Sequence, residues 1–261
     1  DSKSCFARSE SSILSSPTRN MNLDNLNNLI ELFSLQANKQ NKKDIFLEWL
    51  NPLNKKTYTW EETQNNISKL SKIIRENIKE DDRCLLVSEN RPEWFISDIA
   101  IMLSGGITVP AYTTYTEEDY KYLIEDCEPS LVIVSNNEML KKLNNTINEK
   151  KFIKKIITLD EVNEVTNNLN IIDKNKFLDF NTILKNNLFD TDGIQNNKLK
   201  RTSPACIIYT SGTGGNPKGV ILSHGGILNN LVGASEILKP LIDSRPVFLT
   251  WLPLSHSYEH S

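Results

Sequence analysis

The stretch Tyr209-Thr-Ser-Gly-Thr-Gly-Gly-Asn-Pro-Lys-Gly-Val220 separates two apolar runs, Ala205–Tyr209 and Val220–Leu222. Its glycines allow backbone N–H groups to turn toward one point, because glycine has no side chain to block such turns. Its serine and threonine hydroxyls are further donors, and its lysine supplies a compact positive charge. These groups suit phosphate oxygens, so the pattern predicts a loop that binds the polyphosphate of ATP. A glycine-rich turn without a ligand is the alternative.

Two other phosphate-binding loops fit these residues poorly. A Walker A loop needs Gly-Lys-Ser/Thr at the start of a helix, whereas Lys218 stands between Pro217 and Gly219 and strand-forming residues follow. The dinucleotide fingerprint G-x-G-x-x-G begins correctly at Gly212, but Pro217 occupies the position of its third glycine. The loop is therefore expected to join two strands.

The loop resembles the signature of the adenylate-forming superfamily, which includes acyl-CoA synthetases, luciferases and the adenylation domains of peptide synthetases. The usual form is Tyr-Thr-Ser-Gly-Thr-Thr-Gly-x-Pro-Lys-Gly-Val, and this sequence departs from it by having Gly214 in place of the second threonine. The change removes one side-chain hydroxyl and no backbone donor. Trp251–Glu259 is similar to the superfamily's Leu-Pro-Leu-x-His segment, and Asn90–Tyr112 is similar to its first helix–strand unit.

The resemblance extends over roughly residues 40 to 261, and it is greatest to long-chain fatty acyl-CoA synthetases around Arg91–Trp94 and Leu254–His256. It implies that a carboxylic acid attacks the α-phosphate of Mg-ATP to give an acyl-adenylate and pyrophosphate. The thiol of coenzyme A then displaces AMP. ATP, Mg²⁺ and coenzyme A are the expected cofactor and substrates, beside the carboxylic acid itself.

The resemblance also implies roles for individual residues. The ATP phosphates are expected to contact Thr210, Ser211, Gly212, Thr213, Gly214, Gly215 and Lys218. Thr213 is in addition a candidate magnesium contact, because Mg²⁺ takes oxygen ligands and bridges phosphate groups. His256 is expected to contact the acyl carboxylate or the α-phosphate. The alternatives are a solvated turn lysine for Lys218 and a structural histidine for His256, and no catalytic residue is assigned within these residues.

Composition limits the class of protein. The chain is 38% hydrophobic and 24% charged, which fits a globular protein, and its net charge of −3 gives no basic excess for nucleic acid. No stretch reaches the roughly 18 apolar residues of a membrane-spanning helix, and no signal-peptide core is present at the N-terminus. Four scattered cysteines show no metal-binding spacing. A cytoplasmic setting is expected, with peripheral contact to a membrane left open.

Apolar runs alternate along the chain with segments of helical periodicity, and this pattern predicts an α/β fold of mainly parallel sheets flanked by helices. The resemblance implies that this fold is the N-terminal portion of the adenylate-forming enzyme large domain. Strands are expected at 83–88, 107–109, 131–134, 156–159, 205–210, 220–222 and 246–249, with a hairpin at 45–60. Helices are expected at 23–37, 59–78, 92–104, 116–127, 137–149 and from 223 onward. Residues 161–200 are polar and are expected to form a surface excursion. The loop and the His256 segment follow strands, so one shared site is expected at the carboxyl ends of strands.

The expected domain organisation rests on a shift in composition and on which motifs are present. Residues 1–20 are rich in serine and precede Met21, so they are expected to be a disordered tail or an artefact upstream of the true start. Residues 21–261 are expected to be a truncated AMP-binding N-terminal domain without its C-terminal domain. The superfamily's adenine, ribose and catalytic-lysine motifs have no counterpart here, so the chain is expected to be an inactive fragment. A ligase for an aryl or amino acid and a non-catalytic nucleotide-binding module are the other functions left open.

Overall fold

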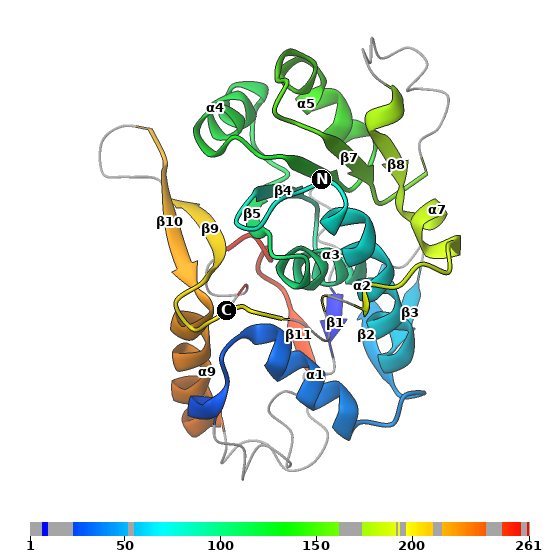
Figure 1. Ribbon diagram of the computed structural model, residues 1–261, viewed down its shortest axis with the longest axis vertical. Coiled ribbons are helices and arrows are strands. Elements are labelled where there is room, and N and C mark those ends of the chain that lie inside the picture. Colours follow the sequence, from blue (N-terminus) through cyan, green and yellow to red (C-terminus); the bar gives the residue numbers. More distant parts are fainter. Residues whose placement is uncertain are drawn as a thin grey trace.

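The fold is that of a computed structural model, which describes residues 7–9, 23–51, 55–161, 174–191, 193, 197–210, 216–238, 247–256 and 260. Within these residues the strands form two sheets, one of seven strands in the order β10-β9-β5-β4-β6-β7-β8 and one of four in the order β11-β1-β2-β3. Helices surround both sheets (Figure 1).

The larger sheet is parallel except at one edge. Its strands are β4 (Arg83–Val87), β5 (Ile107–Ala111), β6 (Leu131–Val134), β7 (Lys155–Thr158), β8 (Phe177–Asp179), β9 (Pro204–Thr210) and β10 (Lys218–Ser223). All neighbouring pairs from β9 to β8 are parallel, and β10 pairs antiparallel with β9. Every residue of β5 and of β6 is buried, as expected for central parallel strands that are covered on both faces. The predicted α/β class is therefore confirmed.

Helices lie on both faces of the larger sheet and beside the smaller one. They are α1 (Leu29–Lys39), α2 (Trp60–Arg75), α3 (Pro92–Leu103), α4 (Glu117–Cys127), α5 (Asn137–Glu149), α7 (Phe180–Lys185) and α9 (His224–Leu238), with 3-10 turns η3 (Leu23–Asn25) and η4 (Lys174–Lys176). Side chains of β4 alternate between two clusters, because successive residues of a strand face opposite sides. Cys84 and Leu86 pack with α2 and α3, whereas Leu85 and Val87 pack with α4 and α5.

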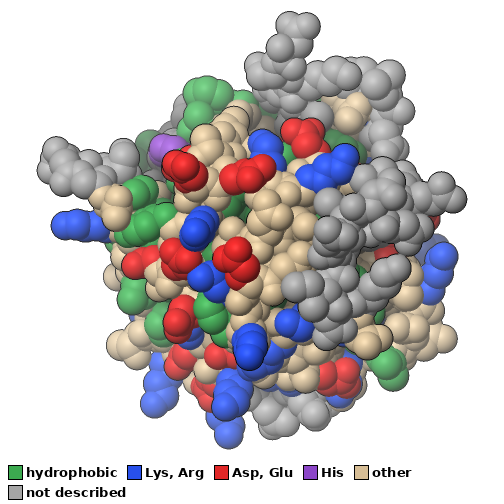
Figure 2. Space-filling view, turned by 90° about the horizontal axis from the view of Figure 1, so that it is seen from above, with side chains coloured by type: hydrophobic (Ala, Val, Ile, Leu, Met, Phe, Trp, Pro, Cys, Tyr) green, Lys and Arg blue, Asp and Glu red, His purple; other side chains and the backbone are tan. Residues whose placement is uncertain are grey.

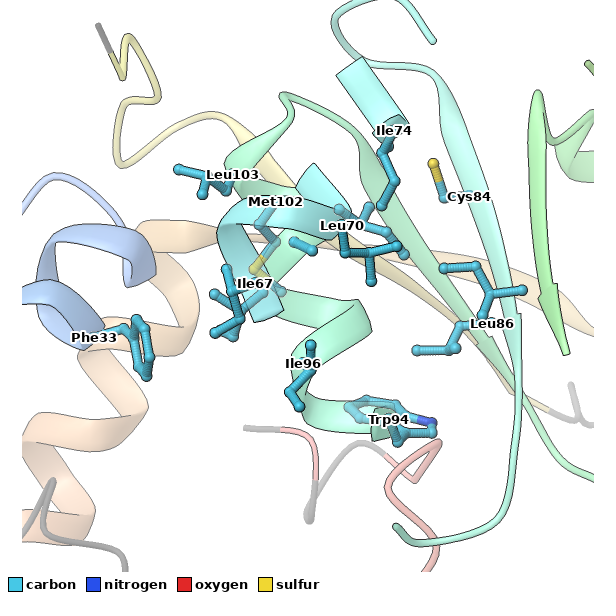
Figure 3. Close-up of a cluster of buried hydrophobic side chains, with 14 of the residues drawn as sticks. Phe33, Ile67, Leu70, Ile74, Cys84, Leu86, Trp94, Ile96, Met102 and Leu103 are labelled. Carbon is cyan, nitrogen blue, oxygen red and sulfur yellow. The ribbon is translucent and has the colours of Figure 1, made fainter. Parts of the chain in front are cut away.

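Figure 3 shows the cluster between α2, α3 and β4. Leu70 and Ile74 of α2, Cys84 and Leu86 of β4 and Ile96 of α3 are all fully buried in it. On α2 the spacing of these leucine and isoleucine residues matches one helical face, as the sequence predicts. The carboxyl ends of β4, β5 and β9 therefore project from a rigid layer of packed apolar side chains.

The smaller sheet is antiparallel. It consists of β1 (Ala7–Ser9), β2 (Ile45–Trp49), β3 (Lys56–Thr59) and β11 (Phe248–Thr250). The predicted hairpin at 45–60 is confirmed by the β2–β3 pairing, and its turn residues 52–54 lie outside the described part. Residues 7–9 are the described part of 1–20, and they form β1 between β11 and β2. The division of the chain at residue 20 stays a prediction.

Three elements differ from the sequence prediction. The first helix begins at Leu29 rather than near residue 23, because the Asn28 side chain accepts a hydrogen bond from the Glu31 amide and caps it there. The second helix ends at Arg75, before residue 78. The expected excursion at 161–200 contains β8 and the buried Phe180 and Ile183 in its described part, so it contributes to the sheet and the core. A three-residue strand is too short to produce a periodic sequence signal.

Replacing Thr59 with alanine is expected to lower the free energy of unfolding by about 1 kcal/mol. The sequence predicts a capping box at Thr59 and Glu62, and the structure has both of its reciprocal hydrogen bonds. Alanine leaves the Glu62 amide without its partner. Chemical denaturation measures the change, with Thr57→Ala, at the exposed position of β3, as the matched control. Equal stability of the two variants would show that the cap contributes nothing.

Candidate functional site

The predicted loop lies between two hydrogen-bonded strands, as expected. Thr210 is the last residue of β9, Lys218 is the first residue of β10, and the two are paired across the hairpin. Both are exposed, so a hydroxyl and an ammonium group are present together at the mouth of the loop. Ser211, Gly212, Thr213, Gly214 and Gly215 lie outside the described residues, and their roles stay predictions.

His256 lies on a segment that a single asparagine fixes. Asn90 follows β4, and its side-chain nitrogen donates to the Leu252 carbonyl oxygen at 2.6 Å while its oxygen accepts from the Leu254 amide at 2.9 Å. This side chain therefore binds the backbone of the segment as a neighbouring strand would. The His256 amide donates to the Pro253 carbonyl oxygen at 2.8 Å, and its side chain is exposed.

The two predicted segments reach the same edge of the larger sheet. β4 and β9 lie on either side of β5 and are both parallel to it, so their carboxyl ends point in one direction. The loop continues directly from β9, and Asn90 holds the His256 segment three residues beyond the end of β4. The preceding strand, β11, belongs to the smaller sheet, and the Asn90 hydrogen bonds connect this segment to the carboxyl edge of the larger one.

A second contact near His256 involves His260, which the sequence alone does not single out. Its buried imidazole lies 3.4 Å from the Asp98 carboxylate of α3 and 3.6 Å from the Cys206 sulfur of β9. Burial by itself lowers the pKa of His260, but the nearby Asp98 carboxylate and the Cys206 thiol raise it to about 10. The imidazole is therefore protonated at neutral pH and pairs with Asp98. No sequence motif could reveal this, because the contacts link residues 54 or more positions apart.

His224 has a structural role. It is buried at the start of α9, and its Nδ1 accepts a hydrogen bond from the Leu29 amide at 3.4 Å. Burial lowers the pKa of His224 to about 4, although the negative charge of Asp98 acts to raise it. The ring is neutral at pH 7 and remains an acceptor, so it joins α1 to α9.

Arg91 forms a buried ionic cluster beside the carboxyl end of β4. Its Nε donates to Glu93 at 2.8 Å, its Nη2 donates to Asp160 at 2.9 Å, and its guanidinium lies over the Trp49 ring at 4.9 Å. Lys56 reaches the same Glu93 carboxylate at 2.9 Å. The cluster connects α3 with β3 and with the segment after β7, so it holds the Asn90 turn against the sheet.

The groups at the loop mouth fit a magnesium-bound polyphosphate. Among the described residues, no set of three or more His, Cys, Asp or Glu side chains could hold a metal ion. Mg²⁺ in nucleotide sites takes most of its ligands from phosphates and water, with one or two oxygens from the protein. The Thr210 hydroxyl is of this type, and Lys218 supplies charge for phosphate oxygens. Thr213, the predicted magnesium contact, lies outside the described residues.

The surface over α4 and α5 shows acidic and basic side chains interspersed (Figure 2). The described residues on this face form no broad area of one charge, in keeping with the net charge of −3. In the described part of the chain, no helix combines the length and the apolar character needed to cross a bilayer. Cys84, Cys127 and Cys206 are free thiols and buried.

Comparisons with known proteins agree with this geometry. The model of a family described as AMP-binding enzyme matches residues 33–261. Long chain acyl-CoA synthetase 3 of Arabidopsis thaliana is 31% identical over 208 residues, which cover 77% of this chain and 30% of the relative. The long-chain-fatty-acid–CoA ligase ACSBG2 of Xenopus laevis is 32% identical over 171 residues, which cover 64% of this chain and 22% of the relative. The chain thus spans less than a third of these two relatives.

Among solved structures, the fatty acyl-adenylate ligase from L. pneumophila, in complex with acyl adenylate and pyrophosphate, is similar with a TM-score of 0.63. The match covers 91% of this chain and 37% of that chain, at 22% sequence identity. At this identity the likeness shows the fold. Since the family model covers nearly all of the chain from α1 onward, and the fold matches an adenylate-forming enzyme, this chain belongs to the AMP-binding enzyme family.

Proposed function

We propose that the complete protein activates a long-chain fatty acid with ATP and then transfers the acyl group to coenzyme A. The observation that carries the proposal is the loop Thr210–Lys218, a phosphate-binding pattern at the carboxyl end of a parallel strand. Membership of the AMP-binding family supports ATP as the nucleotide. Relatives named as long chain acyl-CoA synthetases and long-chain-fatty-acid–CoA ligases support the acyl substrate.

The reaction proceeds in two steps. A carboxylate oxygen of the fatty acid attacks the α-phosphorus of ATP, and the bond to pyrophosphate breaks. The thiol sulfur of coenzyme A then attacks the acyl carbon of the adenylate, AMP leaves, and the thiol proton passes to solvent. Mg²⁺, when bound, neutralises phosphate charge in the first step.

The residues of this chain would act in the first step by positioning and electrostatics. Lys218 and the Thr210 hydroxyl would bind the β- and γ-phosphate oxygens, together with Ser211, Gly212, Thr213, Gly214 and Gly215. His256 would contact the acyl carboxylate or the α-phosphate from the neighbouring segment. We place this activity in the cytoplasm, with peripheral access to membrane lipid, because a long-chain fatty acid partitions into bilayers.

The test is pyrophosphate exchange into ATP by the complete protein with palmitate, benzoate or an amino acid as the acid. The proposal expects rapid exchange with palmitate in the presence of Mg²⁺ and at least about tenfold slower exchange with the other two acids, since a long apolar chain adds favourable burial. Exchange that is fastest with benzoate or an amino acid would reassign the substrate. Binding of Mg-ATP without exchange for any acid would instead indicate a non-catalytic nucleotide-binding module.

A further inference from the structure

Both ends of the β9–β10 loop are hydrogen-bonded to α4. On one side, the Tyr122 hydroxyl donates to the carbonyl oxygen of Pro217, which directly precedes Lys218, at 2.9 Å. On the other side, the hydroxyl of Tyr209, which directly precedes Thr210, donates to the Asp126 carboxylate. Figure 1 shows α4 beside the end of the hairpin from which the loop extends. The residues that flank the loop are thus fixed to one external element.

Helix α4 is a firm support for these contacts. Tyr122 and Asp126 are four residues apart, so they lie on one face of the helix. The adjoining face buries Tyr120, Leu123, Ile124 and Cys127 in the core. A capping box of Thr116 and Asp119 secures its first turn. The helix cannot shift without disturbing the packed cluster on its inner face.

The glycine of the motif makes room for the Tyr209 contact. Gly219 is paired with Tyr209 across the hairpin. A Cβ atom at Gly219 would lie 2.8 Å from Cγ2 of Ile207 and 3.2 Å from Cζ of Tyr209. The Tyr209 ring therefore occupies the space that a side chain at position 219 would need, and in that position its hydroxyl reaches Asp126. Burial, with the neighbouring Asp126, raises the pKa of Tyr209, so the hydroxyl stays protonated and donates.

We propose that Tyr122, Asp126 and Tyr209 form a clamp that holds the two ends of the phosphate-binding loop at a fixed separation, with Gly219 making the space that the clamp needs. This role for α4 rests on the proposed function of the loop. A loop whose ends are fixed before the ligand arrives loses less conformational freedom on binding. The three residues are positioning residues, since they act on the phosphates through the loop backbone.

The clamp is tested first without nucleotide, by hydrogen exchange in the complete protein. Asp126→Ala is compared with Glu125→Ala, a matched control on the same turn whose carboxylate pairs with Lys150 at 2.7 Å, away from the hairpin. We expect the amides of Asn216 and of residues 218–220 to exchange about fivefold faster in Asp126→Ala and in Tyr122→Phe, because the loss of one hydrogen bond lowers the local opening energy. Glu125→Ala should match the wild type there. Unchanged exchange in both variants would overturn the clamp whether or not ATP binds.

The consequence for binding is measured by calorimetric titration with Mg-ATP. Asp126→Ala and Tyr122→Phe should raise the Kd about three- to tenfold, and Asp126→Asn should restore most of the affinity because its amide oxygen still accepts from Tyr209. The titration should still give the wild-type stoichiometry, whereas a general loss of folding would lower it. Wild-type affinity in both variants would show that the clamp does not position the loop. Failure of the wild type to bind Mg-ATP would instead contradict the proposed function. The hydrogen-exchange comparison would still show whether the clamp holds the ends of the loop.

Discussion

Replacing Lys218 with alanine is expected to lower kcat/KM for acyl-adenylate formation by the complete protein about 100-fold or more, the usual result of removing one preorganised electrostatic contact from a transition state. Lys218 is exposed at the first position of β10 and is paired across the hairpin with Thr210. Negative charge accumulates on the departing pyrophosphate during adenylation. The ammonium group should therefore contribute more to the transition state than to ATP binding.

The measurement is pyrophosphate exchange with palmitate at several ATP concentrations. Lys141→Ala, at an exposed position on α5, is the control and should retain wild-type activity. Lys218→Arg should recover part of the rate, because its charge is kept while its geometry differs. A Lys218→Ala protein with wild-type kcat/KM would show that this lysine is an ordinary solvated turn residue.

Replacing Glu93 with alanine is expected to lower the free energy of unfolding by about 3 to 5 kcal/mol, the effect of leaving a buried charge without its partner. Glu93 has a side chain that is 1% exposed, and it accepts hydrogen bonds from Arg91, Lys56 and Tyr58 at 2.8, 2.9 and 3.0 Å. Without it, the fully buried Arg91 keeps Asp160 and the more distant Glu89 as its anionic partners among the described residues. Chemical denaturation at pH 7 measures the loss.

Glu89→Ala is the matched control, because Glu89 lies 3.6 Å from Arg91 and its side chain is partly exposed. We expect it to change the free energy of unfolding by less than about 1 kcal/mol. Equal losses from the two substitutions would mean that burial of Glu93 has no special importance. A stable Glu93→Ala protein would mean that the ionic cluster does not hold α3 in place.

The lowered pKa of the Glu93 carboxylate predicts that the free energy of unfolding decreases at acidic pH, which gives a second test of its role. Burial by itself raises the pKa of Glu93, but hydrogen bonds and charges from Arg91 and Lys56 lower it from 4.5 to about 2. The folded state therefore holds the carboxylate more strongly ionised than the unfolded chain does. Its contribution, roughly 3 kcal/mol, is present above about pH 5 and is lost as the pH falls toward about 2. The wild type should lose more stability over this interval than Glu93→Ala.

Most of the fold could be predicted from the sequence, because its elements carry strong local signals. The α5 helix at 137–149 and the β6 strand at 131–134 have the predicted bounds. The α5 segment has clear helical periodicity and a recognisable start at Asn136, whose side chain caps the helix, whereas β6 is a short continuous run of apolar residues. The sequence did not reveal β8 or β1, because three residues give no pattern and their pairing partners are distant in the chain.

The candidate site was predicted in part. The loop motif located Thr210 and Lys218, and strand prediction on each side placed them at the ends of a hairpin. The supporting contacts could not be predicted, because Asn90 binds residues more than 160 positions away and Asp126 bonds with Tyr209 across 83 positions. Such contacts depend on which strands become neighbours in the sheet, and the sequence alone leaves that order open.

Titration of the complete protein with Mg-ATP, followed by hydrogen exchange of the peptides that span residues 209–220, tests most directly whether this hairpin binds the nucleotide. We expect hydrogen exchange in these peptides to slow at saturating Mg-ATP. The slowing should be smaller in Lys218→Ala at the same Mg-ATP concentration. A contrary result would be equal exchange of these peptides with and without saturating Mg-ATP, together with protection of another part of the protein. The phosphates would then bind elsewhere, and the hairpin would not be the nucleotide site.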